Sequence, residues 1–109
     1  MNKLTPAEEQ VMLRLWKLEK AAVKDILELY DDPKPAYNTV STLVRILERK
    51  KFIKHKAVGR GFVYLPKISI LDYREYLANH LLISYFNNNR KEITSFFNVS
   101  GNINEILKA

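Results

Sequence analysis

Cysteine is missing from this 109-residue chain, and the only histidines are His55 and His80. The lack of cysteine excludes a disulfide framework, a thiolate metal site and a cysteine nucleophile, and it fits a reducing cytosol. The two histidines lie far apart and have no carboxylate at a metal-ligand spacing, so we expect no metal and no cofactor. Gly59-Arg60-Gly61 lacks the Lys-Ser or Lys-Thr ending of a nucleotide-binding loop, and no nucleophile–base pairing is evident. The sequence therefore does not predict an enzyme.

Long apolar runs are also absent. Residues 1–6 contain no apolar stretch that could form the core of a signal peptide, and no later stretch reaches the length needed to cross a bilayer. Apolar residues nevertheless make up 47% of the chain, which is typical of a globular protein rather than a disordered one. We expect a cytoplasmic protein without membrane insertion.

Acidic residues are scarce in the middle of the chain. Glu48 is the only one among residues 36–66, which include seven lysines and arginines. The formal net charge of the chain is +6, and this block accounts for the excess because the flanking parts are nearly neutral. Lysines that serve solubility alone are usually spread out and mixed with acids. A concentrated basic block indicates a polyanionic partner.

Apolar spacing predicts two short helices before this block. In the first, Thr5 can cap, Pro6 suits the first helical position, and Glu8 completes a capping box. Its apolar stripe consists of Val11, Met12, Leu15, Trp16 and Leu18. After a break at residues 20–22, the second helix carries an apolar face of Val23, Ile26, Leu27 and Tyr30. The two prolines in residues 31–35 end it.

A third helix has two distinct faces. Apolar residues expected to face the core recur at i, i+3, i+4 and i+7, at Val40, Leu43, Val44 and Leu47. The same spacing recurs on a short polar face, at Asn38, Ser41, Thr42 and Arg45, which Arg49 continues. Ordinary solvated faces favour Glu and Lys, whereas these side chains offer compact groups suited to base edges and phosphates. On this helix alone, a chance run of weak helix formers and a nucleic-acid-reading face are about equally supported.

The residues that follow predict a β-hairpin with a basic tip. Residues 53–58 and 62–65 are strand-like runs, and Gly59-Arg60-Gly61 between them is a turn bracketed by glycines. Arg60 therefore lies at the tip, and Lys54 and Lys56 share one face of the first strand. Three short helices followed by such a hairpin form a winged helix-turn-helix, whose third helix enters the major groove and whose wing rests on the DNA backbone. We predict a mainly α protein with a winged-helix DNA-binding domain at residues 1–67.

Two groups of side chains are predicted to contact double-stranded DNA. The recognition helix contributes Asn38, Thr39, Ser41, Thr42, Arg45 and Arg49, with Thr42 and Arg45 nearest the bases. The wing and its surroundings contribute the backbone-contacting cations Lys50, Lys54, Lys56 and Arg60. His55 is expected to be a strand residue near a phosphate.

Residues 68–109 predict a helical dimerisation segment. Ser69 begins a new helix that runs to about Phe86, and an asparagine run at residues 87–89 interrupts it before two short amphipathic pieces. So short a helical stretch cannot bury its own apolar surface, and for a DNA-binding domain the natural partner is a second copy. The predicted dimer contacts are Tyr73, Leu77, Leu81, Phe86, Ile93, Phe96, Phe97 and Ile106. The alternative is that these helices fold back on their own winged helix.

Two stretches of the sequence resemble a known family. They contain Thr5-Pro-Ala-Glu-Glu, Val11-Met12 and Trp16, then Tyr37-Asn-Thr-Val-Ser-Thr, Arg45-Ile-Leu-Glu-Arg-Lys-Lys-Phe-Ile and His55-Lys. In this order they resemble the penicillinase and methicillin-resistance (BlaI/MecI) repressor family, closely over residues 4–66 and more loosely beyond. The resemblance implies a winged-helix repressor that binds palindromic operators as a homodimer through its C-terminal helices. It also implies inactivation by proteolysis in that part, brought about by a membrane sensor system, and β-lactamase or penicillin-binding-protein genes among the targets.

The chain departs from the family's pattern at several positions. Penicillinase members begin the recognition helix with Ser-Pro-Lys, where this chain has Ala36-Tyr37-Asn38, so a different operator is expected. The glycine that commonly ends this helix is Lys51, which would carry strain of about 1 kcal/mol in a left-handed conformation. The copper-responsive branch uses C-terminal cysteines, which this chain lacks. The cleaved Asn-Phe bond of the family aligns with Ser95-Phe96, the predicted cleavage site.

Two other interpretations of a winged helix are a protein-interaction module and an RNA-binding module. The second normally requires exposed aromatic platforms for single-stranded bases, which the sequence lacks. A protein-docking surface has no need to gather the whole net charge on the recognition helix and wing. Binding that weakens steeply with salt would indicate DNA, and indifference to salt would indicate a protein partner.

Overall fold

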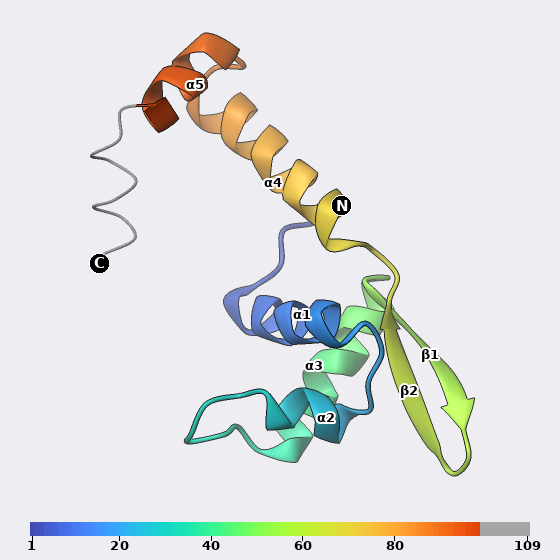
Figure 1. Cartoon of the computed structure of the whole chain (residues 1–109). Coiled ribbons are helices and arrows are strands. Elements are labelled where there is room, and N and C mark those ends of the chain that lie inside the picture. The colour runs from blue at the N-terminus through green and yellow to red at the C-terminus, as the bar shows by residue number, and fades with distance from the viewer. Residues whose placement is uncertain (99–109) are drawn as a thin grey trace. The chain divides into compact units, whose positions relative to one another are not determined.

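A computed structural model describes residues 1–98 of the chain (Figure 1). Along this part the elements are α1 (Pro6–Leu18), α2 (Val23–Glu28), α3 (Tyr37–Arg49), β1 (Ile53–Val58), β2 (Gly61–Pro66), α4 (Ile70–Tyr85) and α5 (Arg90–Asn98). The chain divides into two compact units, Met1–Asp72 and Tyr73–Ala109. The first unit holds α1, α2, α3 and the β1–β2 hairpin, which is the element order of a winged helix. The predicted mainly α fold, with a hairpin after the third helix, is confirmed.

α1 begins where the sequence predicts. The hydroxyl of Thr5 accepts a hydrogen bond from the backbone N–H of Glu8 at 3.2 Å, and the carboxylate of Glu8 accepts one from the backbone N–H of Thr5 at 2.9 Å. This reciprocal capping box satisfies amide groups that the first turn of a helix leaves without partners. At the other end, Glu19 leaves the helix with a φ of 69°, and the chain turns toward the sheet.

The core of the first unit forms between α1, α2 and α3. Its fully buried side chains come mainly from the predicted apolar stripes: Val11, Met12, Leu15, Ile26, Val40, Val44, Leu47 and Ile53. Fully burying one such side chain contributes about 1.5–3 kcal/mol, so these residues fix the position of α3 against the other two helices. Leu43 was predicted to face the core and is only half-buried, because it lies at the edge of the apolar stripe.

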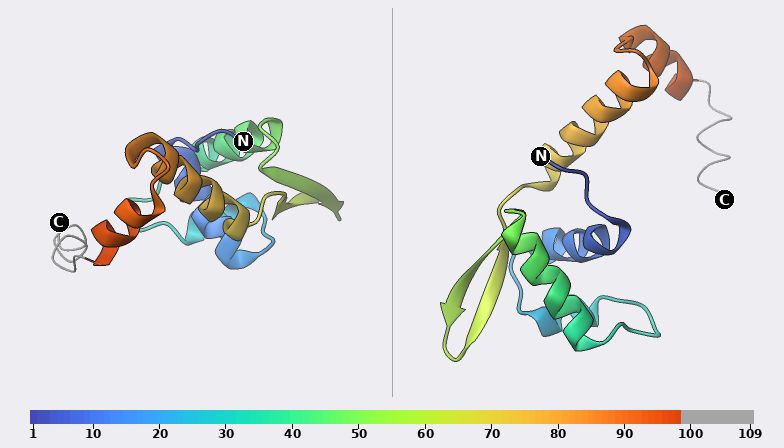
Figure 2. Two further views of the ribbon diagram at one scale, coloured as in Figure 1. Left: turned by 90° about the horizontal axis from the view of Figure 1, so that it is seen from above. Right: turned by 180° about the vertical axis from the view of Figure 1, so that it is seen from behind.

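β1 and β2 form an antiparallel hairpin that lies beside α3 and projects beyond the helices as a wing (Figures 1 and 2). A further segment pairs with β2, since Ala21 and Tyr64 exchange backbone hydrogen bonds of 3.0 and 2.8 Å. The sequence indicated only a break between helices at this point, because a single pairing residue leaves no periodic pattern. The pairing ties the wing to the segment between α1 and α2.

α3 ends in a Schellman motif centred on Lys51. The backbone N–H of Phe52 bonds to the carbonyl of Leu47 at 2.9 Å, and that of Lys51 bonds to the carbonyl of Glu48 at 3.0 Å. Lys51 has a φ of 68°, so it keeps the left-handed conformation that glycine adopts without strain. Phe52 and Ile53 are buried immediately afterwards, and their burial offsets the strain while directing the chain into β1.

Asparagines separate the two described helices of the C-terminal part. α4 begins at the predicted cap, where the hydroxyl of Ser69 accepts a hydrogen bond from the backbone N–H of Asp72 at 3.0 Å. After α4, Asn87 and Asn88 adopt positive φ values of 50° and 59°, which asparagine tolerates better than most residues. The side chain of Asn89 then caps α5, accepting from the backbone N–H of Glu92 at 3.0 Å. The predicted helix break is confirmed.

Many apolar side chains of the second unit are exposed or only half-buried. Of the predicted dimer contacts, Tyr73 is buried, Leu77, Leu81, Phe86, Ile93 and Phe96 are half-buried, and Phe97 is exposed. Ile83 and Tyr85, which the sequence analysis did not single out, are 61% and 71% exposed. The rings of Phe86 and Phe96 pack edge to face with centroids 5.6 Å apart. Ile106, with the rest of the last predicted helical piece, lies outside the described residues.

Candidate nucleic-acid interface

The polar face of α3 is open to solvent. Asn38, Thr39, Thr42, Arg45 and Arg49 are exposed, and Ser41 is half-buried. On another face of the same helix, Val40, Val44 and Leu47 have no exposed surface. The buried face anchors the helix, and the polar face is free to approach a ligand. A recognition helix requires this arrangement.

The two faces of the wing differ in chemistry. In the register of β1 and β2, His55 lies opposite Tyr64 on one face, whereas Lys54 and Lys56 occupy the other. The His55 face is turned toward α3, because the imidazole Nδ1 of His55 contacts the carboxylate of Glu48. The prediction that the two lysines share a face is therefore correct, but this face points away from the recognition helix.

Arg60 lies at the tip of the wing. It follows Gly59, whose φ of 60° belongs to the left-handed region, and it precedes Gly61 at the start of β2. The side chain of Arg60 is exposed, and the glycines on either side leave space around it. The guanidinium is therefore accessible to a phosphate.

An open groove of about 470 Å³ lies between the polar face of α3 and the wing. Its lining comes from α2, α3, β2 and the residue before α2: Ala22, Val23, Lys24, Tyr37, Ser41, Arg45, Gly61, Phe62 and Tyr64. Ser41 and Arg45 are predicted DNA contacts. The groove thus joins the recognition helix to the wing in one continuous surface.

Four of the groove residues were missed by the sequence analysis. Tyr37 precedes Ser41 by four residues and so lies on the same face of α3, a spacing that could have identified it. Phe62 and Tyr64 alternate along β2 and could have been assigned to one face of the strand. Lys24 gave no local signal, because only the tertiary fold brings α2 to the groove.

Glu48, the only acidic residue in the basic block, is engaged within the interface. Its carboxylate contacts His55, and the His55 ring packs edge to face on Phe62 with centroids 4.9 Å apart. His55 is a strand residue as predicted, and its partner in the structure is this carboxylate. The contact links α3 directly to the wing.

Tyr64 is held in its neutral form by its surroundings. Burial raises the pKa of its phenol, nearby Glu48 and Tyr37 raise it further, and the Arg45 guanidinium partly opposes them. The phenol therefore remains protonated near neutral pH and can donate a hydrogen bond. Tyr37 and Arg45 of α3 line the same groove as Tyr64 of β2.

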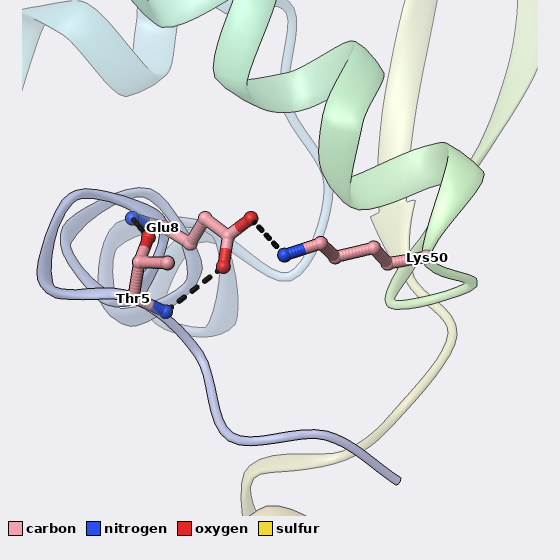
Figure 3. Close-up of polar contacts among 3 residues, drawn as sticks. All are labelled: Thr5, Glu8 and Lys50. Carbon is pink, nitrogen blue, oxygen red and sulfur yellow. Dashed lines mark hydrogen bonds and ion pairs between the residues drawn. The ribbon is translucent and has the colours of Figure 1, made fainter.

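Lys50 differs from the other cations of the block because its ammonium is already paired. Its Nζ donates to the carboxylate of Glu8 at 2.7 Å, and that carboxylate also caps α1 through Thr5 (Figure 3). Burial raises the pKa of Glu8, but the hydrogen bonds from Lys50 and Thr5 and the charge of Lys50 outweigh burial, so the pKa lies below its ordinary value. Lys50 therefore joins the end of α3 to the start of α1.

Neither a metal cluster nor a membrane-spanning helix is found in the part of the chain that the structure describes. Across residues 1–98, no three side chains of the metal-binding types lie together. No helix over the same residues is both long enough and apolar enough to cross a bilayer.

A polar, basic recognition helix beside a hairpin wing defines a winged-helix DNA-binding protein. Residues 4–106 match the family model described as penicillinase repressor. The chain therefore belongs to the penicillinase repressor family, a family of DNA-binding transcriptional repressors rather than enzymes. A comparison with curated proteins finds no match. The family resemblance inferred from the sequence is confirmed.

Proposed function

We propose that this protein represses transcription in the cytoplasm by binding a palindromic operator as a homodimer. The observation that carries the proposal is the shared surface formed by α3, the groove and the wing. Arg45 on α3 and Arg60 at the wing tip border this surface, and the one acidic residue of the block is engaged by His55. Such a surface suits a polyanion with a regular backbone.

Within this proposal, α3 lies in the major groove. Thr42 and Arg45 read base edges, and Asn38, Thr39, Ser41 and Arg49 fix the helix against the neighbouring backbone. Arg60 binds a phosphate from the wing. Lys54 and Lys56 lie on the far face of the wing, so they contribute long-range attraction more than direct contact. Lys50 acts mainly through its ion pair with Glu8.

Dimerisation is proposed to use the second unit. Its exposed and half-buried apolar side chains, including Ile83, Tyr85 and Phe97, are of the kind that a partner covers. A two-fold dimer presents two recognition helices to two half-sites, which explains the expectation of a palindromic operator. Linking two half-sites raises the affinity well above that of one winged helix.

Relief of repression is proposed to follow the scheme that the family resemblance implies. A membrane sensor system would bring about cleavage at Ser95-Phe96, which lies in α5, and β-lactam-resistance genes would be the targets. Phe96 packs on Phe86, so a cut there would detach a ring that helps hold α5 in place. Loss of dimer contacts would release the operator while leaving the winged helix intact.

The experiment that tests this function measures binding of the full chain to a short DNA duplex at several salt concentrations, together with sedimentation at micromolar protein. We expect affinity that falls steeply with salt and a dimer in sedimentation. Arg60→Ala should make the log–log salt slope shallower by about 0.9 per protomer, whereas Lys17→Ala on α1 should leave it unchanged. An affinity that does not change with salt concentration would favour a protein partner. A monomer in sedimentation would refute the proposed dimer.

A further inference from the structure

The groove between α2, α3 and β2 has a lining that base reading by α3 does not explain. We propose that it holds the sugar-phosphate backbone of one DNA strand, with Lys24 and Tyr37 binding a phosphate and Phe62 packing against a deoxyribose. The inference rests on the proposed DNA-binding function and deepens it, because it assigns contacts to residues outside the polar face and the wing tip.

The charges around the groove suit a phosphate. Lys24 and Arg45 are the charged residues of its lining, and no carboxylate belongs to it. The two nearby carboxylates already have partners. Asp25 accepts a hydrogen bond from the backbone N–H of Ala22 at 3.1 Å, and Glu48 contacts His55. The lining of the groove therefore presents two cations and no anion to solvent, which suits a phosphate.

The aromatic residues of the groove suit the sugar. Tyr37 and Phe62 are 53% and 52% exposed, a large area for aromatic rings in contact with water. They come from different elements, α3 and β2, yet line the same groove. A deoxyribose offers an apolar edge next to each phosphate, so a strand of DNA can cover these rings and satisfy the Tyr37 hydroxyl and the Lys24 ammonium together.

A small ligand is the main competing occupant. The volume of the groove falls within the range of small-molecule pockets, but such pockets usually bury most of their ligand. This groove is open, and Ser41 and Arg45 make it continuous with the face of α3 proposed to read bases. Between a helix in the major groove and a wing on the adjacent backbone, the chain of phosphates must pass through this region. A DNA strand therefore fits better than a small ligand.

Lysine footprinting of the unmodified full chain gives the first test. The protein is acetylated briefly with and without a short DNA duplex at low salt, and the modification of each lysine is measured by mass spectrometry. We expect DNA to protect Lys24 and to leave the exposed Lys17 of α1 reactive. If DNA binds but Lys24 stays as reactive as Lys17, the proposed backbone site in the groove is wrong and the DNA-binding function stands. Protection of Lys24 by millimolar inorganic phosphate, but not by DNA, would identify a small-anion site and would also overturn the proposed backbone site.

Two conservative variants give the second test, with fluorescence anisotropy on the same duplex as the measurement. Lys24→Gln should make the salt slope shallower by about 0.9 per protomer, and Lys17→Gln, which changes net charge equally, should not. Tyr37→Phe keeps the ring and removes only the hydroxyl, so it should weaken binding roughly tenfold, as expected for a hydrogen bond to a charged group. If Lys24→Gln and Tyr37→Phe both bind DNA with the affinity and salt slope of the wild type, the proposed backbone site is wrong. If the wild type shows no salt-dependent binding to DNA, the proposed backbone site and the proposed function are both wrong.

Discussion

Glu8 links the start of α1 to the end of the recognition helix, and replacing it tests this link. Its carboxylate accepts hydrogen bonds from the backbone N–H of Thr5 at 2.9 Å and from Nζ of Lys50 at 2.7 Å, and its side chain is only 4% exposed. Glu8→Gln keeps an acceptor for Thr5 but removes the charge that pairs with Lys50. The substitution therefore isolates the ion pair from the helix cap.

The expected loss of stability follows from the exposure of the pair. Removing one partner of a fully buried pair costs about 3–5 kcal/mol, whereas surface pairs contribute about 0–1 kcal/mol. The Lys50 side chain is 39% exposed, so solvent screens it and we expect Glu8→Gln to cost about 1 kcal/mol. Glu8→Ala also removes the cap and should cost about 1 kcal/mol more. In a domain of this size, 1 kcal/mol corresponds to about 4–8 °C in Tm.

The pH dependence of stability gives a second check on the contribution of Glu8, because the direction of its pKa shift fixes the pH range in which that contribution is lost. The folded pKa of Glu8 lies below its ordinary value of 4.5, because the contacts with Lys50 and Thr5 outweigh the effect of burial. A carboxyl of this kind contributes stability above its unfolded pKa and loses it as the pH falls through the folded pKa. Urea denaturation should therefore show wild type more stable than Glu8→Gln at neutral pH, with the difference shrinking as the pH falls below 4.5. Lys50→Gln, the matched control, should lose the same pH dependence, and a wild-type advantage that persists unchanged into acid would refute the reasoning.

Three further substitutions test the interface and the helix end. Arg45→Ala should cost about 1–3 kcal/mol on the operator and much less on unrelated duplexes, measured by anisotropy; an equal loss on both would remove Arg45 from base reading. Glu48→Gln removes the one negative charge of the basic block and should strengthen binding to any duplex; weaker binding would mean that its contact with His55 matters more than its charge. Lys51→Gly should stabilise the fold by up to about 1 kcal/mol in urea, because glycine adopts the left-handed conformation without strain; a destabilised variant would contradict this.

Local chemistry predicted a large part of the fold from the sequence. The Thr5 cap, the Ser69 cap, the asparagine break and the glycine-bracketed turn each depend on residues within a few positions of one another, so sequence spacing was sufficient. The bridge between Ala21 and Tyr64 could not be predicted in this way, because it joins distant residues through backbone groups that carry no side-chain pattern.

The candidate site shows the same division between local and tertiary information. The polar face of α3 was predictable because a helix has a fixed period. The partner of Lys50 was not, since only folding brings α1 to the end of α3. The groove was missed for a similar reason, as Lys24 lies in α2 and Phe62 in β2. Sequence charge therefore predicted the kind of partner, and the fold was needed to decide which cations face it.

This distinction has a measurable consequence for the salt dependence of DNA binding. If all seven cations of residues 36–66 bound phosphates, the log–log slope would be about −6 per protomer at about 0.9 for each contact. The structure pairs Lys50 with Glu8, turns Lys54 and Lys56 away from α3, and places Lys51 at the helix end beyond the groove. Arg45 is assigned to base edges, so Arg49 and Arg60 remain for the phosphates and the groove adds Lys24. We therefore expect a slope of about −3 per protomer. A slope near −6 per protomer would require the lysines of the far wing face and the paired Lys50 to bind phosphates as well, and would contradict this assignment of the cations.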